Sequence, residues 1–157
     1  MLRFSEGSYS RPIRSANIRK IMTIRKLYIR HWTILFFLSF DARNAEDIEE
    51  ALIWAGAPDS IMEHVHTNVL AERRDEGFCF SNSSLRRSVL AVGKTSTGLE
   101  FMNTIVHEIT HVAIHIAQED NIDPYSEELA YLAGDIMHGV SDIVCELSCP
   151  HCNSRKV

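Results

Sequence analysis

The sequence predicts an α+β domain in which a small, mostly antiparallel sheet packs against one long helix, with further helices around it. Two observations support this class. The chain has 157 residues, of which 45% are hydrophobic and 24% charged, and this suits one compact domain. Its periodic segments follow one another as a strand, two helices, a hairpin and then two or three helices.

The composition excludes several classes of protein. No apolar run approaches the ~18–20 residues of a membrane helix, so we expect no membrane partner. A formal net charge of -5 argues against nucleic-acid binders, which usually carry a basic excess. Three of the four cysteines lie in residues 145–157, unlike a disulfide framework, so we expect a reducing, cytoplasmic compartment.

The chain divides into three parts. Residues 1–21 are rich in Ser and Arg without periodicity, and we interpret them as a loose basic N-terminal extension. The alternative for this segment is an arm that binds anionic surfaces. Residues 22–144 hold the periodic segments and form the domain, and residues 145–157 are a Cys-rich C-terminal tail.

The first predicted element is a central strand over residues 32–40, an apolar run rich in aromatic and branched side chains. Basic residues precede this run, as they do in a secretory signal peptide. A cut after Ala42 or Ala45 would put Phe40 or Arg43 at the −3 position, where a small residue is needed. We therefore favour the strand over the signal peptide.

Two helices are predicted next. The first covers residues 45–55, with Asn44 as its N-cap, acidic residues in its first turn and Gly56 just past its end. The second follows Pro58, where residues 60–63 match a capping box. Both belong to the helices that we expect around the sheet.

A hairpin and a long helix follow. Short strands are predicted at residues 78–80 and 89–92, with a polar turn between them. The helix begins at a capping box formed by Thr97 and Glu100. Apolar residues then recur every three or four positions over residues 101–116, which predicts one buried helix face.

This helix carries the pattern His-Glu-x-x-His at His107, Glu108 and His111. Histidines four residues apart lie on one helix face, so both rings can reach one zinc ion at ~2.0–2.1 Å. Glu108 is rotated by ~100° from His107, so it can take a proton from a water molecule on the zinc without ligating the metal. The alternative is two partly exposed histidines beside a solvated glutamate.

A catalytic zinc usually has three protein ligands, and the third is expected from a following helix. His115 lies ~12 Å along the helix axis from His107, too far to share its ion, so we expect it to orient a neighbour or to pack. A second helix is predicted after Asp123, its cap. Glu127 is our candidate ligand and Glu128 the reserve; alternatively, both are acids that favour the helix dipole.

Together, His107-Glu-Ile-Thr-His111 and the segment Glu127-Glu-Leu-Ala-Tyr-Leu-Ala-Gly134 resemble the minimal zincin-like metallopeptidases of bacteria and their phages or mobile elements. These are small Glu-zincins, and the resemblance covers about residues 78–138. It implies a zincin-like fold, Zn²⁺ as the cofactor and a peptide or protein as the substrate. It also implies that His107, His111 and Glu127 are the metal ligands, that Glu108 is the general base and that Tyr131 is a donor to the developing oxyanion.

A zincin cleft usually has an edge strand that pairs with an extended substrate, and the strand around residues 89–94 is the natural candidate here. Tyr131 or His138 would stabilise the oxyanion of the tetrahedral intermediate. The alternative for both side chains is packing with satisfied hydrogen bonds.

The C-terminal tail holds a second constellation at Cys145, Cys149, His151 and Cys152. Cys149-x-x-Cys152 has the spacing of half a zinc knuckle, and Cys145 or His151 could add to the pair. The alternatives are reduced structural thiols and a redox dithiol, although a redox motif expects a strand before it and a helix after it.

The leading hypothesis is a zinc-dependent hydrolase, specifically a metallopeptidase. Its first rival is a non-catalytic zinc-binding or interaction protein on the same scaffold. The second rival is a regulator that contacts nucleic acid through the Arg-rich extension and the cysteine tail, and the net charge weighs against it. The sequence does not name the substrate or the oligomeric state.

Overall fold

The structure is a computed structural model that describes residues 22–67 and 77–149. The predicted N-terminal extension, residues 68–76, and the tail beyond Cys149 lie outside the described residues. The described part holds a four-stranded mixed sheet, five α-helices and one short 3-10 helix. In chain order these are β1 (Thr23–Ile29), β2 (Trp32–Phe40), η1 (Ala42–Asn44), α1 (Ala45–Trp54), α2 (Asp59–Val65), β3 (Gly77–Asn82), β4 (Arg87–Gly93), α3 (Gly98–Glu119), α4 (Glu127–His138) and α5 (Ser141–Ser148).

The sheet has the strand order β1-β2-β4-β3. The hairpins β1–β2 and β3–β4 are antiparallel, and they join through a parallel pairing of β2 with β4. The predicted α+β class and the β3–β4 hairpin are confirmed, and the sheet is mixed. Strand β1 was not predicted: its basic residues, the half-buried Arg25 and the exposed Lys26, hide the short buried alternation of Leu27 and Ile29.

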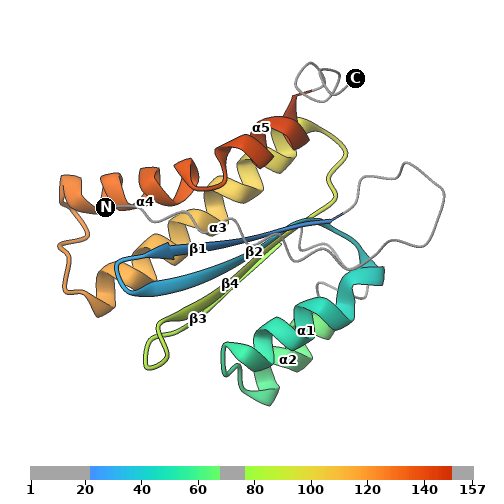
Figure 1. Cartoon of the computed structure of the whole chain (residues 1–157), viewed down its shortest axis with the longest axis horizontal. Coiled ribbons are helices and arrows are strands. Elements are labelled where there is room, and N and C mark those ends of the chain that lie inside the picture. Colours follow the sequence, from blue (N-terminus) through green and yellow to red (C-terminus); the bar gives the residue numbers. More distant parts are fainter. Residues whose placement is uncertain (1–21, 68–76, 150–157) are drawn as a thin grey trace.

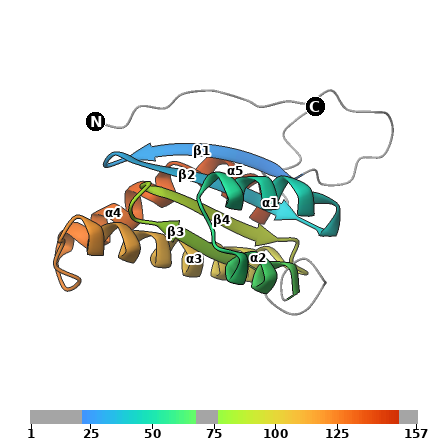
Figure 2. The same cartoon turned by 90° about the horizontal axis from the view of Figure 1, so that it is seen from below.

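The helices cover both faces of the sheet. Figure 1 shows α3, α4 and α5 on one face and α1 and α2 on the other, and Figure 2 shows the same layers from below. An apolar core lies between the sheet and the helices on each face, and β2 contributes to both cores. Trp32, Ile34 and Phe36 face the α3 layer, whereas Phe37 and Phe40 face the α1 layer. Burial on both faces explains why β2 is apolar along nearly its whole length.

The predicted starts of α1, α2 and α3 are confirmed, but of their predicted capping bonds only those of α3 form. Thr97 and Glu100 form the predicted capping box of α3. Asn44 precedes α1 but makes no capping bond to it, because its side chain accepts from the backbone N–H of Asp41, the N-cap of η1. The predicted box at residues 60–63 is wrong, because α2 already begins after Pro58.

The start of α4 differs from the prediction. Helix α4 begins at Glu127, after Ser126, and not at the predicted cap Asp123. The carboxylate of Asp123 accepts from the backbone N–H of Tyr125 and so closes a turn ahead of the helix. Among the helices of residues 22–67 and 77–149, none combines the length and hydropathy that a membrane span requires.

Candidate metal centre

The His-Glu-x-x-His segment lies in the middle of α3, whose predicted apolar face is buried against the sheet. His107 and His111 are exposed on the outer side of this helix, and their Nε2 atoms are 3.1 Å apart. An ion ~2.05 Å from both nitrogens would subtend an angle of about 100° between them, close to the tetrahedral value. The spacing of the two nitrogens is therefore compatible with a shared zinc ion, although in this structure the two rings hydrogen-bond to each other.

Glu108 points to the other side of the same helix turn. It is 7% exposed and is the one charged side chain that is buried among the described residues. Its Cγ lies 3.2 Å from the place where a Cβ on Gly77 would stand, so it is packed against β3. Because a buried carboxylate is costly, such groups concentrate at functional sites, and this burial marks Glu108 as a candidate base.

His115 continues the histidine row by one more turn. Its ring stacks on His111, with centroids 6.3 Å apart and planes inclined by 28°. Its Nδ1 lies 2.9 Å from Ser81 Oγ and 3.8 Å from Cys79 Sγ, both on β3. Burial, together with the nearby His111, lowers the pKa of His115, which favours a neutral ring. These contacts agree with the expectation that His115 orients a neighbour or packs.

A chain of polar groups leads to His115 from Trp32 and Ser88, which are buried, through the half-buried Ser81, and no sequence motif indicated it. Trp32 Nε1 donates to Ser88 Oγ at 2.7 Å, and Ser88 Oγ lies 2.7 Å from Ser81 Oγ. Ser81 and Ser88 are directly opposed across the β3–β4 ladder. The predicted strands, residues 78–80 and 89–92, stop short of both serines, whereas β3 and β4 extend far enough to include them.

Glu127 and Tyr131 lie on the solvent side of α4. Both are exposed, and Tyr131 is 70% accessible. Within residues 22–67 and 77–149, no three His, Cys, Asp or Glu side chains are grouped so that they could hold a metal ion. The structure thus brings His107 and His111 together but does not bring Glu127 to them. The third-ligand role of Glu127 and the oxyanion role of Tyr131 stay predictions.

The remaining candidates on α4 form no metal-holding group with the histidine pair in the described residues. Glu128 accepts a hydrogen bond from Arg30 at 2.6 Å, across to the β1–β2 turn. His138 is exposed at the last residue of α4. A Cβ on Gly134 would meet nothing within 4 Å, so α4 does not pack closely against another element at this glycine.

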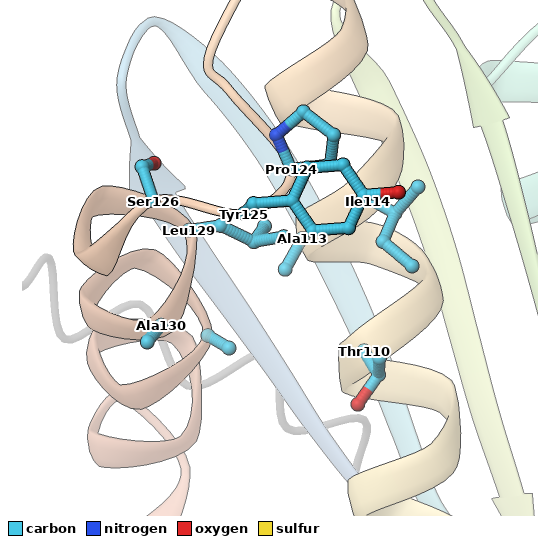
Figure 3. A pocket seen from close by; sticks show the side chains of 9 residues that line it. Thr110, Ala113, Ile114, Pro124, Tyr125, Ser126, Leu129 and Ala130 are labelled. Atoms are coloured by element: carbon cyan, nitrogen blue, oxygen red, sulfur yellow. The ribbon is translucent and has the colours of Figure 1, made fainter.

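An apolar pocket of about 310 Å³ lies between α3 and α4 (Figure 3). Thr110 and Ile114 line it from α3, beside His111 in the sequence, and Ala130 lines it from α4. The ring of Tyr125 extends over the pocket from the connecting segment (Figure 3). The histidine pair is therefore flanked by an apolar pocket on the α4 side and by β3 on the other side.

The edge of the sheet beside the site is β3 and not β4. Strand β4 pairs with β2 on one side and with β3 on the other, so the predicted substrate-pairing edge at residues 89–94 is wrong. The reason is the parallel β2–β4 pairing, which the local pattern of a hairpin does not reveal. β3 is the outer strand, and its Cys79 and Ser81 side chains face α3.

The described cysteines form no disulfide. Burial raises the pKa of the Cys79 thiol to about 12, with Glu108 adding to the shift, so Cys79 is protonated at neutral pH. Cys145 lies within α5 and Cys149 directly after it, so this helix crosses the boundary drawn at residue 145. Cys152 lies outside the described residues, and the metal hypothesis for the tail stays a prediction.

Comparisons of the chain with protein-family models, with curated proteins and with solved structures find no match.

Proposed function

We propose that the protein is a zinc-dependent hydrolase of the metallopeptidase class. The observation that supports this most is the pairing of His107 and His111, Nε2 to Nε2 at 3.1 Å, on a helix that also carries the buried Glu108 between them in the sequence. Bound between the two rings, zinc would supply Lewis-acid activation of a carbonyl group and of a water molecule. Glu127 is the proposed third ligand, and α4 would have to shift or rotate to bring it in.

The chain supplies the remaining functions of such a site. Glu108 takes the proton of the attacking water and returns it to the leaving amine. Among the described residues β3 is an edge strand, and its outer side offers backbone groups that can pair with an extended peptide. The pocket between α3 and α4 accepts an apolar side chain of that peptide next to His111. Tyr131 is the proposed donor to the oxyanion.

The test combines metal content with hydrolysis. Zinc is measured by elemental mass spectrometry in the wild type, His107→Ala, Glu108→Gln and the control His64→Ala, whose histidine lies on α2 across the sheet. We expect about one zinc per chain in all but His107→Ala. Peptide cleavage, followed by mass spectrometry on a mixed peptide library, should fall by about 10²–10⁴-fold in Glu108→Gln.

Two outcomes would overturn parts of this proposal. Zinc that is retained by Glu108→Gln and by the wild type, with cleavage by neither, favours the non-catalytic zinc-binding protein. Zinc that persists in His107→Ala assigns the metal to the cysteine tail. Protein without metal after reconstitution would remove the enzyme hypothesis altogether.

A further inference from the structure

We propose that a directed hydrogen-bond chain from Trp32 holds His115 in its Nε2–H tautomer and so presents a hydrogen-bond donor beside His111. This Nε2–H would donate a hydrogen bond to a carbonyl or carboxylate oxygen of a peptide bound at the histidine pair. This ligand role rests on the proposed function, whereas the tautomer does not.

The direction of the hydrogen-bond chain is set at Trp32, its buried end. An indole Nε1–H can only donate, so Ser88 Oγ accepts from Trp32 at 2.7 Å. Ser88 is fully buried, and in the described part of the chain the remaining partner of its hydroxyl is Ser81 Oγ at 2.7 Å. The Ser88 hydroxyl therefore donates to Ser81, because a buried hydroxyl hydrogen without an acceptor is costly.

The same assignment of donors and acceptors extends to His115. Ser81 accepts from Ser88, so its own hydrogen is available to His115 Nδ1 at 2.9 Å. The thiol of Cys79 lies 3.8 Å from the same nitrogen and can only share the one lone pair that the closer Ser81 hydroxyl takes. A neutral ring that accepts at Nδ1 carries its hydrogen on Nε2.

The opposite arrangement satisfies fewer groups. If His115 donated from Nδ1 to Ser81, the Ser81 hydroxyl would have to donate to Cys79 Sγ at 4.0 Å, a long and weak contact. The buried Cys79 thiol would then lose both of its acceptors, His115 Nδ1 and Ser81 Oγ. Hydrogen-bond counting thus favours the chain that runs from Trp32 outward.

The Nε2–H of His115 lies next to the proposed metal position. Nδ1 is directed at β3, so Nε2 on the far side of the ring is directed away from that strand, and it makes no hydrogen bond within residues 22–67 and 77–149. The ring stacks on His111, one helix turn from the proposed metal position. His115 is therefore a ligand-binding residue, and Trp32, Ser88 and Ser81 are positioning residues that act through it.

The experiment is a long-range ¹H–¹⁵N correlation spectrum of the histidine side chains in ¹⁵N-labelled, metal-free protein. His115→Phe assigns the His115 signals by their loss. We expect a pyridine-type Nδ1 and a pyrrole-type Nε2 for His115 in the wild type. Ser81→Ala should move its two ¹⁵N shifts toward an average of the tautomers, whereas Ser84→Ala in the exposed turn should leave them unchanged.

A pyrrole-type Nδ1 in the wild type would overturn the proposal, and this result needs no variant that might fail to fold. Unchanged His115 shifts in folded Ser81→Ala would also overturn it. The binding role has its own readout: His115→Phe should raise KM for a cleaved peptide about tenfold with kcat and zinc content retained. An unchanged KM would remove the binding role but leave the tautomer, and absence of zinc would count only against the proposed hydrolase.

Discussion

Gly77 and Glu108 share one narrow space between β3 and α3. A Cβ on Gly77 would lie 3.2 Å from Glu108 Cγ, 2.8 Å from Thr104 Cγ2 and 2.9 Å from the backbone oxygen of Ala91. The absence of a side chain at Gly77 is thus what allows the buried carboxylate to lie against the strand. The position of the proposed base depends on a residue outside the motif.

We expect Gly77→Ala to destabilise the fold by about 1–3 kcal/mol, because the backbone oxygen of Ala91 cannot easily yield to the added methyl group. It should also displace Glu108 and lower peptide cleavage more than zinc binding. Chemical denaturation and zinc content measure the two effects separately. Wild-type stability together with wild-type cleavage would show that the space is not as tight as the structure has it.

The third metal ligand can be tested with two neighbouring glutamates. If α4 rotates to bring Glu127 to the histidine pair, Glu127→Gln should weaken zinc binding by at least about tenfold, measured by competition with a chelator. Glu128→Gln is the matched control, because it removes the contact with Arg30 and not a ligand. Equal zinc affinities in both variants would exclude Glu127 from the metal site.

Two glycines in helices should respond to alanine with opposite signs. A Cβ on Gly98 would lie 2.1 Å from the backbone oxygen of Ser148, so Gly98→Ala should separate α3 from the end of α5 and cost about 1–3 kcal/mol. A Cβ on Gly134 meets nothing, and Gly134→Ala should stabilise α4 by about 0.5–1 kcal/mol. Urea denaturation decides this, and stabilisation by both changes would contradict the α3–α5 contact.

Asp41 should make stability depend on pH in the acid range. Hydrogen bonds from Arg43, with help from Lys94 at 2.5 Å, hold the pKa of Asp41 well below its usual value of 3.8. Because the folded-state pKa is the lower one, the stabilisation is complete above about pH 4 and is lost as the pH falls toward the folded-state pKa. Asp41→Asn should therefore cost about 1 kcal/mol near pH 7 and progressively less below pH 4.

The check for Asp41 is urea denaturation of the wild type and the variant from pH 3 to pH 7. Asp135→Asn on the exposed side of α4 is the control, since this carboxylate makes no side-chain hydrogen bond or ion pair in the described residues. A stability difference for Asp41→Asn that stays constant across this range would argue against the ion pairs.

Cys79 should resist alkylation in the folded protein. With its pKa raised to about 12 from 9.0, its thiolate fraction at neutral pH is about 10³-fold lower than that of an ordinary thiol. Iodoacetamide labelling followed by mass spectrometry should modify the exposed Cys145 long before Cys79. The two cysteines should react alike in denaturant, and equal rates in the folded state would contradict the burial of Cys79.

Much of the framework could be predicted because its signals are local. The apolar run of β2, the capping box of α3 and the hairpin of β3 and β4 follow from neighbouring residues in the chain. Strand β1 could not be predicted in this way. It is an edge strand with few buried residues, and its basic side chains imitate the start of a signal peptide.

The histidine pair was also predictable, since helix geometry alone places residues four apart on one face. The relation of α4 to that pair was not. Periodicity correctly puts Glu127 and Tyr131 opposite the core residues Leu132 and Ile136. Whether that opposite side meets α3 or solvent depends on how the two helices lie on the sheet, which is a property of tertiary packing.

The parallel pairing of β2 with β4 has a consequence for how the chain folds. It joins Thr33 to Arg87, a separation of 87 − 33 = 54 residues, whereas each hairpin closes over a short turn. Closing the loop between Thr33 and Arg87 costs more conformational entropy than closing a hairpin, and this cost comes before the contacts between β2 and β4 stabilise the structure. The two hairpins can therefore form early and separately, and their docking along the centre of the sheet would set the folding rate. The surface on which α3 carries the histidine pair exists only after that slow step.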